Sequence, residues 1–465
     1  MTDRYSQEPR PLLLTAKPLR RAVSGRTMSG LLRLWIPLAL SWVLMTAGMP
    51  VVTAVLARMR EPDLQLASLG ISHSVTMAVQ SPVIALLTAS VALAKDRTSL
   101  RLLKRFTVVQ VVLCTLIMAV LAYRPTFDLV IVDLMGTPPE VARLVRPSLL
   151  AFTLFPAGVA YRRFLQGLII QRGSTSQVTY GALIRLATTV GLVLLGFRLG
   201  RWDGALVAAT AMTAGILVEA LYTHLVARQS VRLVEENQVS SAIATLTVPN
   251  LLQFYWPLAI TSMVWLWAPS LINFGLTRAP FPVQSLAVWP VVSAQVVLVS
   301  SLGFSLMEVV VAVLKDPRAV VTVRRFSLIL CAASLAILYP LAFTPLATSW
   351  LQVVAGLNPE LTAFAIPALR WSILLPLIAV VQSWFRGLIV AGESTSSIAQ
   401  ATMINVAIMV VVLLMGAAGK WMMGASLAAV ALTISRIVEV GWLWRWASPV
   451  QRRLGEKARA AGPCT

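Results

Sequence analysis

Residues 164–176 read FLQGLIIQRGSTS, and 220 positions later residues 384–396 read WFRGLIVAGESTS. Both segments carry Gly-Leu-Ile followed by a polar turn that ends in Ser-Thr-Ser. In an apolar chain, leucine-on-leucine matches carry little information, but glycine, serine and threonine at a fixed spacing are hard to obtain by chance. The two segments therefore predict an internal duplication.

The same offset continues outward from these segments without a gap, from residue 37 to residue 219. Its most specific matches are the charged loops AKDR (94–97) with LKDP (314–317), and the pair Glu219 with Glu439. Each repeat holds six predicted helices, an even number, so both repeats enter and leave on the same side. We therefore expect two parallel repeats related by an axis along the membrane normal, an arrangement that places transporter sites between the halves.

Composition indicates the class of protein. Apolar residues make up 58% of the chain, charged residues only 12%, and the mean hydropathy is +0.80. A soluble domain carries about 25% charged residues, and a membrane-spanning helix needs about 20 apolar residues. We predict an all-α polytopic membrane protein with twelve transmembrane helices near 32–57, 66–94, 106–123, 147–171, 177–199, 205–228, 252–275, 286–313, 326–343, 367–390, 398–419 and 424–446.

The distribution of charge predicts the topology. The net charge is +21, and the basic residues gather in the terminal segments and in the loops on the same side of the spans. By the positive-inside rule both termini face the cytosol, in a multi-pass protein of the cytoplasmic (inner) membrane. The charge then reflects topology and contact with the lipid bilayer, not nucleic acid. The expected organisation is a basic cytosolic tail, an N-lobe, a cytosolic linker, a C-lobe and a second basic tail: 1–31, 32–228, 229–250, 251–446 and 447–465.

Ionisable side chains at bilayer depth are costly and mark functional sites. Arg162, Arg370 and Arg386 are near enough to span ends to extend to an interface, whereas Arg163 and Arg185 lie deeper and favour a polar cavity. The candidate substrate-binding residues are Arg163, Arg185, Arg386 and Arg436. The candidate coupling or gating residues are Glu219, Glu439 and Glu308.

Glu219 and Glu439 are the acidic pair that recurs at mid-span in both repeats. Arg436 is three residues before Glu439 on one helix face, so the two are expected to neutralise each other and Glu439 to stay ionised. Ile216 occupies the matching place before Glu219. We expect Glu219 to exchange a proton or to meet an arginine, such as Arg185. The alternative is that both glutamates only tie helices together.

With these features in place, the sequence resembles the MATE/MOP flippase superfamily. The Gly-Leu-Ile turn between the fourth and fifth spans of each half carries the resemblance, as QGLIIQRGST (166–175) and RGLIVAGEST (386–395). RLWIPLAL (33–40), FYWPLAI (254–260) and SLMEVVVAVLKD (305–316) are similar to the progressive ankylosis (ANK) branch. The resemblance implies a secondary exporter with alternating access. Relatives of the ANK branch are linked to efflux of small anions such as citrate, nucleotides and pyrophosphate.

Several functions compete at this stage. MATE proteins commonly carry an acidic coupling residue in the first or seventh span, but 34–57 and 252–275 contain no Asp or Glu. We therefore predict outward transport of a small organic anion, with H⁺ or Na⁺ as a possible coupling ion. The alternatives are cation-coupled multidrug efflux, flipping of lipid-linked saccharides, and a channel or scramblase. No metal, cofactor or catalytic motif favours an enzyme.

Overall fold

The computed structural model describes residues 27–172, 174–236, 246–314, 319–391 and 396–460. Within these residues the chain is helical and contains no strand, and twelve helical segments are long and apolar enough to cross a membrane. The prediction of an all-α protein with twelve transmembrane helices is confirmed.

The N-terminal repeat, called the N-lobe, contains the following elements: α1 (Met28–Thr46), α2 (Gly48–Leu56), α3 (Pro62–Gln80), the 3₁₀ turn η1 (Ser81–Ala85), α4 (Leu86–Leu93), α5 (Arg97–Ala122), α6 (Arg124–Phe127), the π-helix η2 (Asp128–Leu134), α7 (Pro139–Ala151), α8 (Phe155–Gln171), α9 (Thr175–Leu199) and α10 (Gly204–Glu236). The C-lobe contains α11 (Val248–Leu276), α12 (Pro282–Phe304), α13 (Leu306–Val313), α14 (Val320–Phe343), α15 (Leu346–Ser349), the π-helix η4 (Trp350–Val354), α16 (Pro359–Trp371), α17 (Leu374–Ala391), α18 (Ser396–Ala418) and α19 (Gly424–Ala460).

The helix boundaries follow the 220-residue offset. Helices α7 and α16 start and end at matching positions, as do α4 and α13, and α3 begins where α12 begins. The left-handed residues Glu61 and Phe281 match in the same way. The duplication inferred from sequence is therefore a duplication of structure.

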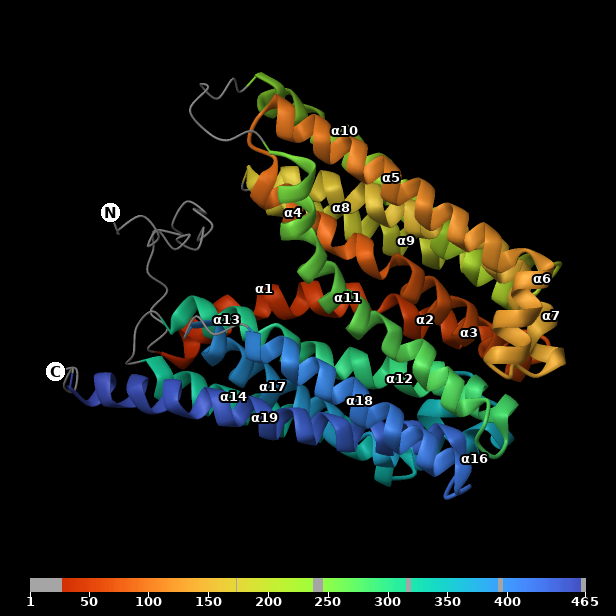
Figure 1. Ribbon diagram of the computed structural model, residues 1–465. Coiled ribbons are helices and arrows are strands. Elements are labelled where there is room, and N and C mark those ends of the chain that lie inside the picture. Colours follow the sequence, from red (N-terminus) through yellow and green to blue (C-terminus); the bar gives the residue numbers. More distant parts are fainter. Residues whose placement is uncertain (1–26, 173, 237–245, 315–318, 392–395, 461–465) are drawn as a thin grey trace.

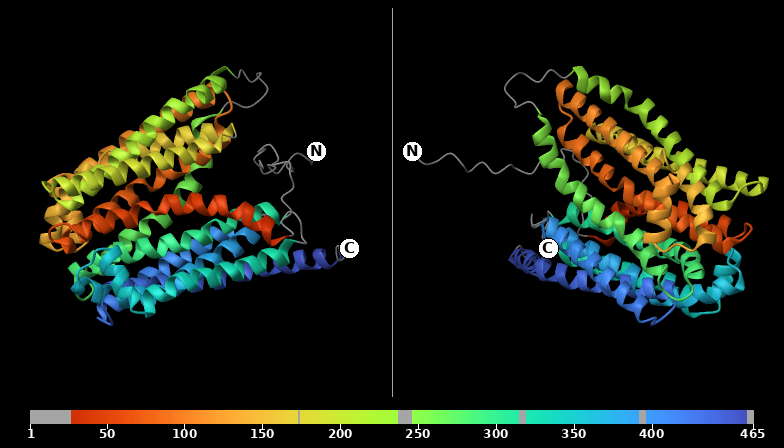
Figure 2. Two further views of the ribbon diagram at one scale, coloured as in Figure 1. Left: turned by 180° about the vertical axis from the view of Figure 1, so that it is seen from behind. Right: turned by 45° about the vertical axis from the view of Figure 1, so that its right-hand side comes forward.

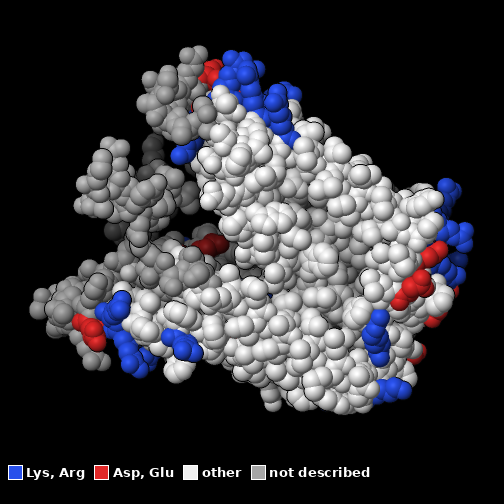
Figure 3. All heavy atoms as spheres, in the orientation of Figure 1, with Lys and Arg blue, Asp and Glu red and all other residues white. Residues whose placement is uncertain are grey.

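The two lobes lie side by side and point the same way (Figure 1). Helices α7 and α16 lie at one end of the molecule, called the loop end. The described chain begins and finishes at the opposite end, called the terminal end (Figures 1 and 2). On the face drawn in Figure 3, charged side chains gather at the two ends, and the surface is hollowed between the lobes at the terminal end. This charge distribution is that of a protein with an apolar belt around its middle.

The first helix of each lobe reaches across to the other lobe at the terminal end. Trp35 of α1 donates its indole N–H to the carbonyl of Leu302 (3.2 Å), and Tyr255 of α11 donates its hydroxyl to the carbonyl of Pro82 (2.6 Å). The rings of Trp35 and Tyr255 also pack edge-on against phenylalanines of the opposite lobe. Because all these contacts match by the offset, α1 and α11 join the lobes symmetrically.

The lobes also meet where α3 packs against α12. A Cβ atom added at Gly70 of α3 would lie 2.7 Å from Cγ of Pro290, which is the residue that matches Gly70 in the C-lobe. The pseudo-twofold axis therefore passes close to this pair. Glycine and proline together allow the two helices to approach.

We expect Gly70→Val to lower the temperature at which the detergent-solubilised protein unfolds. The Pro290 ring is rigid, so α3 and α12 must separate, and overpacking of this kind costs about 1–3 kcal/mol. The control is Gly191→Ala in α9, where an added Cβ meets nothing within 4 Å. That change should be neutral or stabilising. Equal unfolding temperatures for the two variants would contradict the close approach.

Helices extend into the segments that the sequence assigns to the linker and the tails. The linker was expected from residue 229 and the second tail from residue 447, but α10 continues to Glu236 and α19 to Ala460. Helix α1 also begins four residues before residue 32. Hydropathy marks only the apolar part of a helix, whereas arginine, glutamate and glutamine continue it because their helix propensity is high. Residues 1–26, 237–245 and 461–465 of the expected tails and linker lie outside the described residues.

Candidate functional site

The acidic group at mid-span in the N-lobe is Glu219, near the middle of the 33-residue helix α10 and 0% exposed. Arg162 of α8 donates from Nη1 to Oε1 of Glu219 at 2.8 Å, and Gln166, one turn further, donates to the same oxygen at 3.4 Å. Arg185 of α9 lies with Nε 3.4 Å from Oε2, without hydrogen-bond geometry. These residues and Arg163 form the N-lobe cluster.

The N-lobe cluster contains more positive than negative charge. Arg163, next to Arg162 on α8, interacts electrostatically with Arg162, Arg185 and Glu219, so the cluster holds three guanidinium groups and one carboxylate. The Nε–H groups of Arg162 and Arg163 are buried and have no hydrogen-bond partner among the described residues. Buried charges are costly unless they are paired. The cluster therefore offers a surplus of donors and of positive charge to an anion.

The C-lobe holds a related arrangement around Glu439 of α19, which is 1% exposed. Arg386 of α17 donates from Nη2 to Oε1, and Gln382 donates to Oε2 at 2.7 Å. Arg436 donates to the Oε1 atom of Gln382 at 2.9 Å and so joins the same network. These residues form the C-lobe cluster.

The two clusters are related by the repeat with one exchange. Arg162 and Gln166 of α8 match Gln382 and Arg386 of α17, so arginine and glutamine trade places while the glutamate stays. Residues four apart on a helix share one face, and either order therefore brings both side chains to the carboxylate. Arg162, Gln166 and Gln382 were missed as site residues from sequence, although their positions in the offset alignment would have indicated them.

The expected pairing within the C-lobe is wrong. Glu439 pairs with Arg386 and not with Arg436, because α17 offers two donors on the face that meets α19. Glu219, which was expected to lack a fixed partner, has Arg162 as well as the expected Arg185. Arg162 and Arg386 therefore do not extend to an interface.

Two other residues singled out from sequence lie apart from the clusters. Glu308 of α13 accepts a hydrogen bond from the indole of Trp42 of α1 at 3.3 Å, so it joins the two lobes. Arg370 donates to the carbonyl of Ala342 at 3.1 Å and lies against the Phe343 ring near the loop end.

A small cavity of about 90 Å³ adjoins the C-lobe cluster between α12, α17 and α19. Arg436 and Gln382 line it together with Ser293 and Ser300 of α12. The guanidinium and the amide carry donor hydrogens, whereas the Ser293 and Ser300 hydroxyls donate to carbonyls of α12 and offer their oxygens as acceptors. The cavity is a candidate subsite for a small polar group.

At the loop end the lobes are held together by two arginines related by the repeat. Arg58, after α2, donates from Nη2 to the carbonyls of Val353 and, at 3.1 Å, Val354 at the end of η4. Arg278, after α11, donates to the carbonyls of Leu134 (2.8 Å) and Met135 (3.1 Å) at the end of η2. Helix C-terminal carbonyls lack partners within the helix and carry partial negative charge. The loop end is therefore closed by matched contacts.

No family model matches the sequence, and no curated protein matches it. Solved structures do. An inward-facing multidrug resistance MATE family transporter of the MOP superfamily matches with a TM-score of 0.67 at 12% identity, over 89% of this chain and 98% of that one. The inward closed conformation of the lipid II flippase MurJ matches with a TM-score of 0.65 at 13% identity, over 91% of each chain. A MOP superfamily transporter from Pyrococcus furiosus matches with a TM-score of 0.59 at 14% identity, over 93% of this chain and 98% of that one, and reversed polarity of its binding pocket suggests a different function for it.

These similarities establish the fold. The chain has the fold shared by MATE transporters and the MurJ flippase, and none of the three structures is that of an enzyme. The predicted resemblance to the superfamily is confirmed at the level of fold. Its finer assignment to the progressive ankylosis branch stays a prediction.

Proposed function

We propose that this protein is a secondary active exporter of a small organic anion that works by alternating access between its two lobes. The observation that carries the proposal is the excess of buried and half-buried arginine over carboxylate in both clusters, with Glu219 and Glu439 as the acidic partners. In a low-dielectric interior, groups of one sign attract the opposite ion strongly. Citrate, nucleotides and pyrophosphate, the cargo class implied by the ANK resemblance, carry the matching charge.

The arrangement of the lobes is consistent with an inward-open state. The loop end is closed by Arg58 and Arg278, while the surface is hollowed between the lobes at the terminal end (Figure 3). With both termini in the cytosol of an inner-membrane protein, an anion would enter from the cytosol and leave after the loop end opens. Binding of H⁺ or Na⁺ at a cluster glutamate would change its interaction with arginine and so bias this equilibrium.

Transport by the purified protein in proteoliposomes tests the proposal. Labelled citrate, a nucleoside triphosphate, pyrophosphate and a cationic dye are supplied in turn at equal concentrations inside and outside the vesicles, and the distribution of the label is followed with and without an imposed H⁺ or Na⁺ gradient. We expect at least one anion to accumulate against its gradient. Export of the dye without any anion would replace the proposal with multidrug efflux. Movement only down the gradient would indicate a channel or scramblase.

A second candidate is the flipping of a lipid-linked saccharide. The observation that favours it is the TM-score of 0.65 to the MurJ flippase. A diphosphate-linked lipid would present the same negative charge to the arginine clusters. Proteoliposomes that contain a labelled lipid-linked saccharide are treated with a hydrolase added outside, and the fraction of label that is cleaved measures movement of the lipid to the outer leaflet. Flipping of the lipid should proceed without any soluble anion, which distinguishes this function from anion export.

A further inference from the structure

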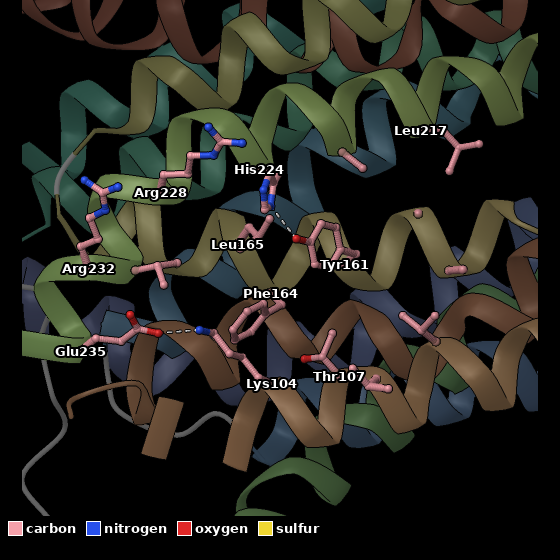
Figure 4. A pocket seen from close by; sticks show the side chains of 16 residues that line it. Lys104, Thr107, Tyr161, Phe164, Leu165, Leu217, His224, Arg228, Arg232 and Glu235 are labelled. Atoms are coloured by element: carbon pink, nitrogen blue, oxygen red, sulfur yellow. Dashed lines mark hydrogen bonds and ion pairs between the residues drawn. The ribbon is translucent and has the colours of Figure 1, made fainter. Parts of the chain in front are cut away.

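A large groove lies outside both clusters, on the N-lobe alone. It has a volume of about 840 Å³, within the range of about 300–1,000 Å³ that is typical of small-molecule sites. Helices α5 and α10 form its walls, and α8 forms its floor (Figure 4). We call this feature the lateral groove.

The lateral groove faces away from the C-lobe. Helices α5 and α10 lie on the side of the N-lobe that is remote from α12 and α19 in both views of the molecule (Figures 1 and 2). In a membrane this side meets lipid. The groove is therefore open to the bilayer and separate from the space between the lobes.

The lining of the lateral groove is divided by depth. Toward the middle of the membrane the walls and floor are mainly apolar, with residues such as Val108, Ala157 and Leu217. Toward the terminal end the lining is charged, with Lys104, Arg228, Arg232 and Glu235. The apolar part of the lateral groove matches an acyl chain, and its charged end matches a lipid headgroup.

The charged end carries an excess of arginine. Lys104 pairs with Glu235, with Nζ 2.7 Å from Oε1, whereas Arg228 and Arg232 form no ion pair with any residue that the structure describes. Both arginines extend from α10 at the same end of the groove as Glu235 (Figure 4). Two guanidinium groups without carboxylate partners are suited to a phosphate.

A polar pair lies one helical turn deeper than Arg228. The hydroxyl of Tyr161 on α8 and Nδ1 of His224 on α10 are 2.6 Å apart (Figure 4). In a glycerophospholipid the ester groups follow the phosphate at about this separation along the membrane normal, and a helical turn advances about 5.4 Å. Hydrogen-bonding groups are therefore present where ester oxygens would lie.

The repeat shows that the fold does not require these residues. In the C-lobe, Leu377 and Ile378 stand where the groove has Ala157 and Gly158, and Trp444 stands in place of His224. Ser448 replaces Arg228. The small floor residues and the additional arginine thus belong to the N-lobe alone, which points to a ligand of that lobe.

We infer that the lateral groove binds an anionic phospholipid of the cytosolic leaflet, with an acyl chain along α8 and the phosphate between Arg228 and Arg232. Basic residues near an anionic leaflet contribute about 1 kcal/mol each to lipid attraction, and burial of the chain contributes through the apolar lining. The proposal concerns lipid recognition, and it does not depend on which molecule the protein transports.

Native mass spectrometry of the full-length protein tests the inference. The protein is reconstituted in nanodiscs of phosphatidylglycerol and phosphatidylcholine in equal amounts, and the lipids it retains after release are counted. Wild type should retain phosphatidylglycerol preferentially. The double variant Arg228→Gln with Arg232→Gln should reduce this preference by about 30-fold, the effect of two arginine contacts. Ala157→Leu, which introduces the C-lobe residue, should reduce retention of both lipids.

The matched control is Arg324→Gln with Arg325→Gln on α14, where Arg324 is the C-lobe counterpart of Lys104. This double variant removes the same charge from the same end of the molecule and should keep the wild-type preference. Equal loss in both double variants would show general attraction to the leaflet and overturn a specific site. Displacement of the lipid by millimolar glycerol 3-phosphate would show a soluble phosphate site instead. Because the readout is retained lipid, failure of the proposed anion transport leaves the result unaffected.

Discussion

Glu219→Ala is expected to lower the unfolding temperature and to abolish transport. The substitution leaves Arg162, Arg163 and Arg185 in the N-lobe cluster without their carboxylate. Removal of one partner from a buried ion pair costs about 3–5 kcal/mol because the other charge stays buried and unpaired. Thermal unfolding of the detergent-solubilised protein, followed by size-exclusion chromatography, measures the loss.

Glu219→Gln separates gating from structural support. Glutamine keeps the shape and an acceptor for Arg162, and the hydrogen bond stays charge-assisted because the guanidinium is ionised. Glu219→Gln should therefore lose less stability than Glu219→Ala, which removes the acceptor as well as the charge. If Glu219 exchanges a proton during transport, the variant loses the dependence on the pH gradient at an unchanged protein level. Glu439→Gln is the matched variant in the C-lobe. Wild-type transport by both glutamine variants would show that the two glutamates only hold helices together.

The swapped order of arginine and glutamine in the two lobes suggests a second substitution that should restore the stability lost by the first. Arg162→Gln alone leaves Glu219 with only Arg185 as a charged partner at short range. Adding Gln166→Arg copies the order found at Gln382 and Arg386 around Glu439. The double variant should recover most of the unfolding temperature lost by the single variant. A double variant as unstable as Arg162→Gln would show that the two lobes hold their glutamates in different ways.

Much of the fold could be predicted because its signals are local or periodic. Apolar length predicts the twelve spans, and the constant offset predicts that α16 repeats α7. The ends of α10 and α19 could not be predicted from hydropathy, since polar residues of high helix propensity continue both helices. The end of α10 is also tied to α5 by the Lys104–Glu235 ion pair, which hydropathy does not register.

The partners of the buried glutamates were predictable only in part. The spacing of Arg436 and Glu439 describes one isolated helix, whereas the observed bonds run between α17 and α19. Which donors reach Glu439 depends on how the two helices are rotated against each other. That rotation is set by packing along both helices, and it cannot be deduced from the spacing of Arg436 and Glu439 in the sequence. Neutral partners such as Gln382 also carry no charge signal in sequence.

Replacement of both loop-end arginines, Arg58→Gln with Arg278→Gln, is expected to open the loop end. Each arginine donates to two carbonyls at the end of a π-helix in the opposite lobe. Contacts of this kind, partly exposed to water, contribute about 1–2 kcal/mol for each arginine. Their joint loss should shift the equilibrium between closed and open loop ends by at least about 30-fold.

The distance between the lobes at this end provides the measurement. Spin labels at Glu140→Cys on α7 and Glu360→Cys on α16 occupy matching, exposed positions in the first turns of these helices, after Cys114, Cys331 and Cys464 are replaced by serine. Pulsed electron–electron double resonance should give a short distance between the two labels in the parent protein and an additional population at a longer distance in the double variant. The control is Arg143→Gln, which breaks an exposed ion pair with Glu61 inside the N-lobe, where Nη2 and Oε2 are 2.8 Å apart.

The repeat makes the single variants informative as well. Arg58 and Arg278 make equivalent contacts on opposite sides of the pseudo-twofold axis, and both act on the same opening of the lobes. Because the two contacts share no partner, their free energies should add. Each single variant should then shift the open-to-closed ratio by about the square root of the factor seen in the double variant. A single variant with the full effect would show that one arginine alone closes the loop end, and an unchanged distance in the double variant would show that neither does.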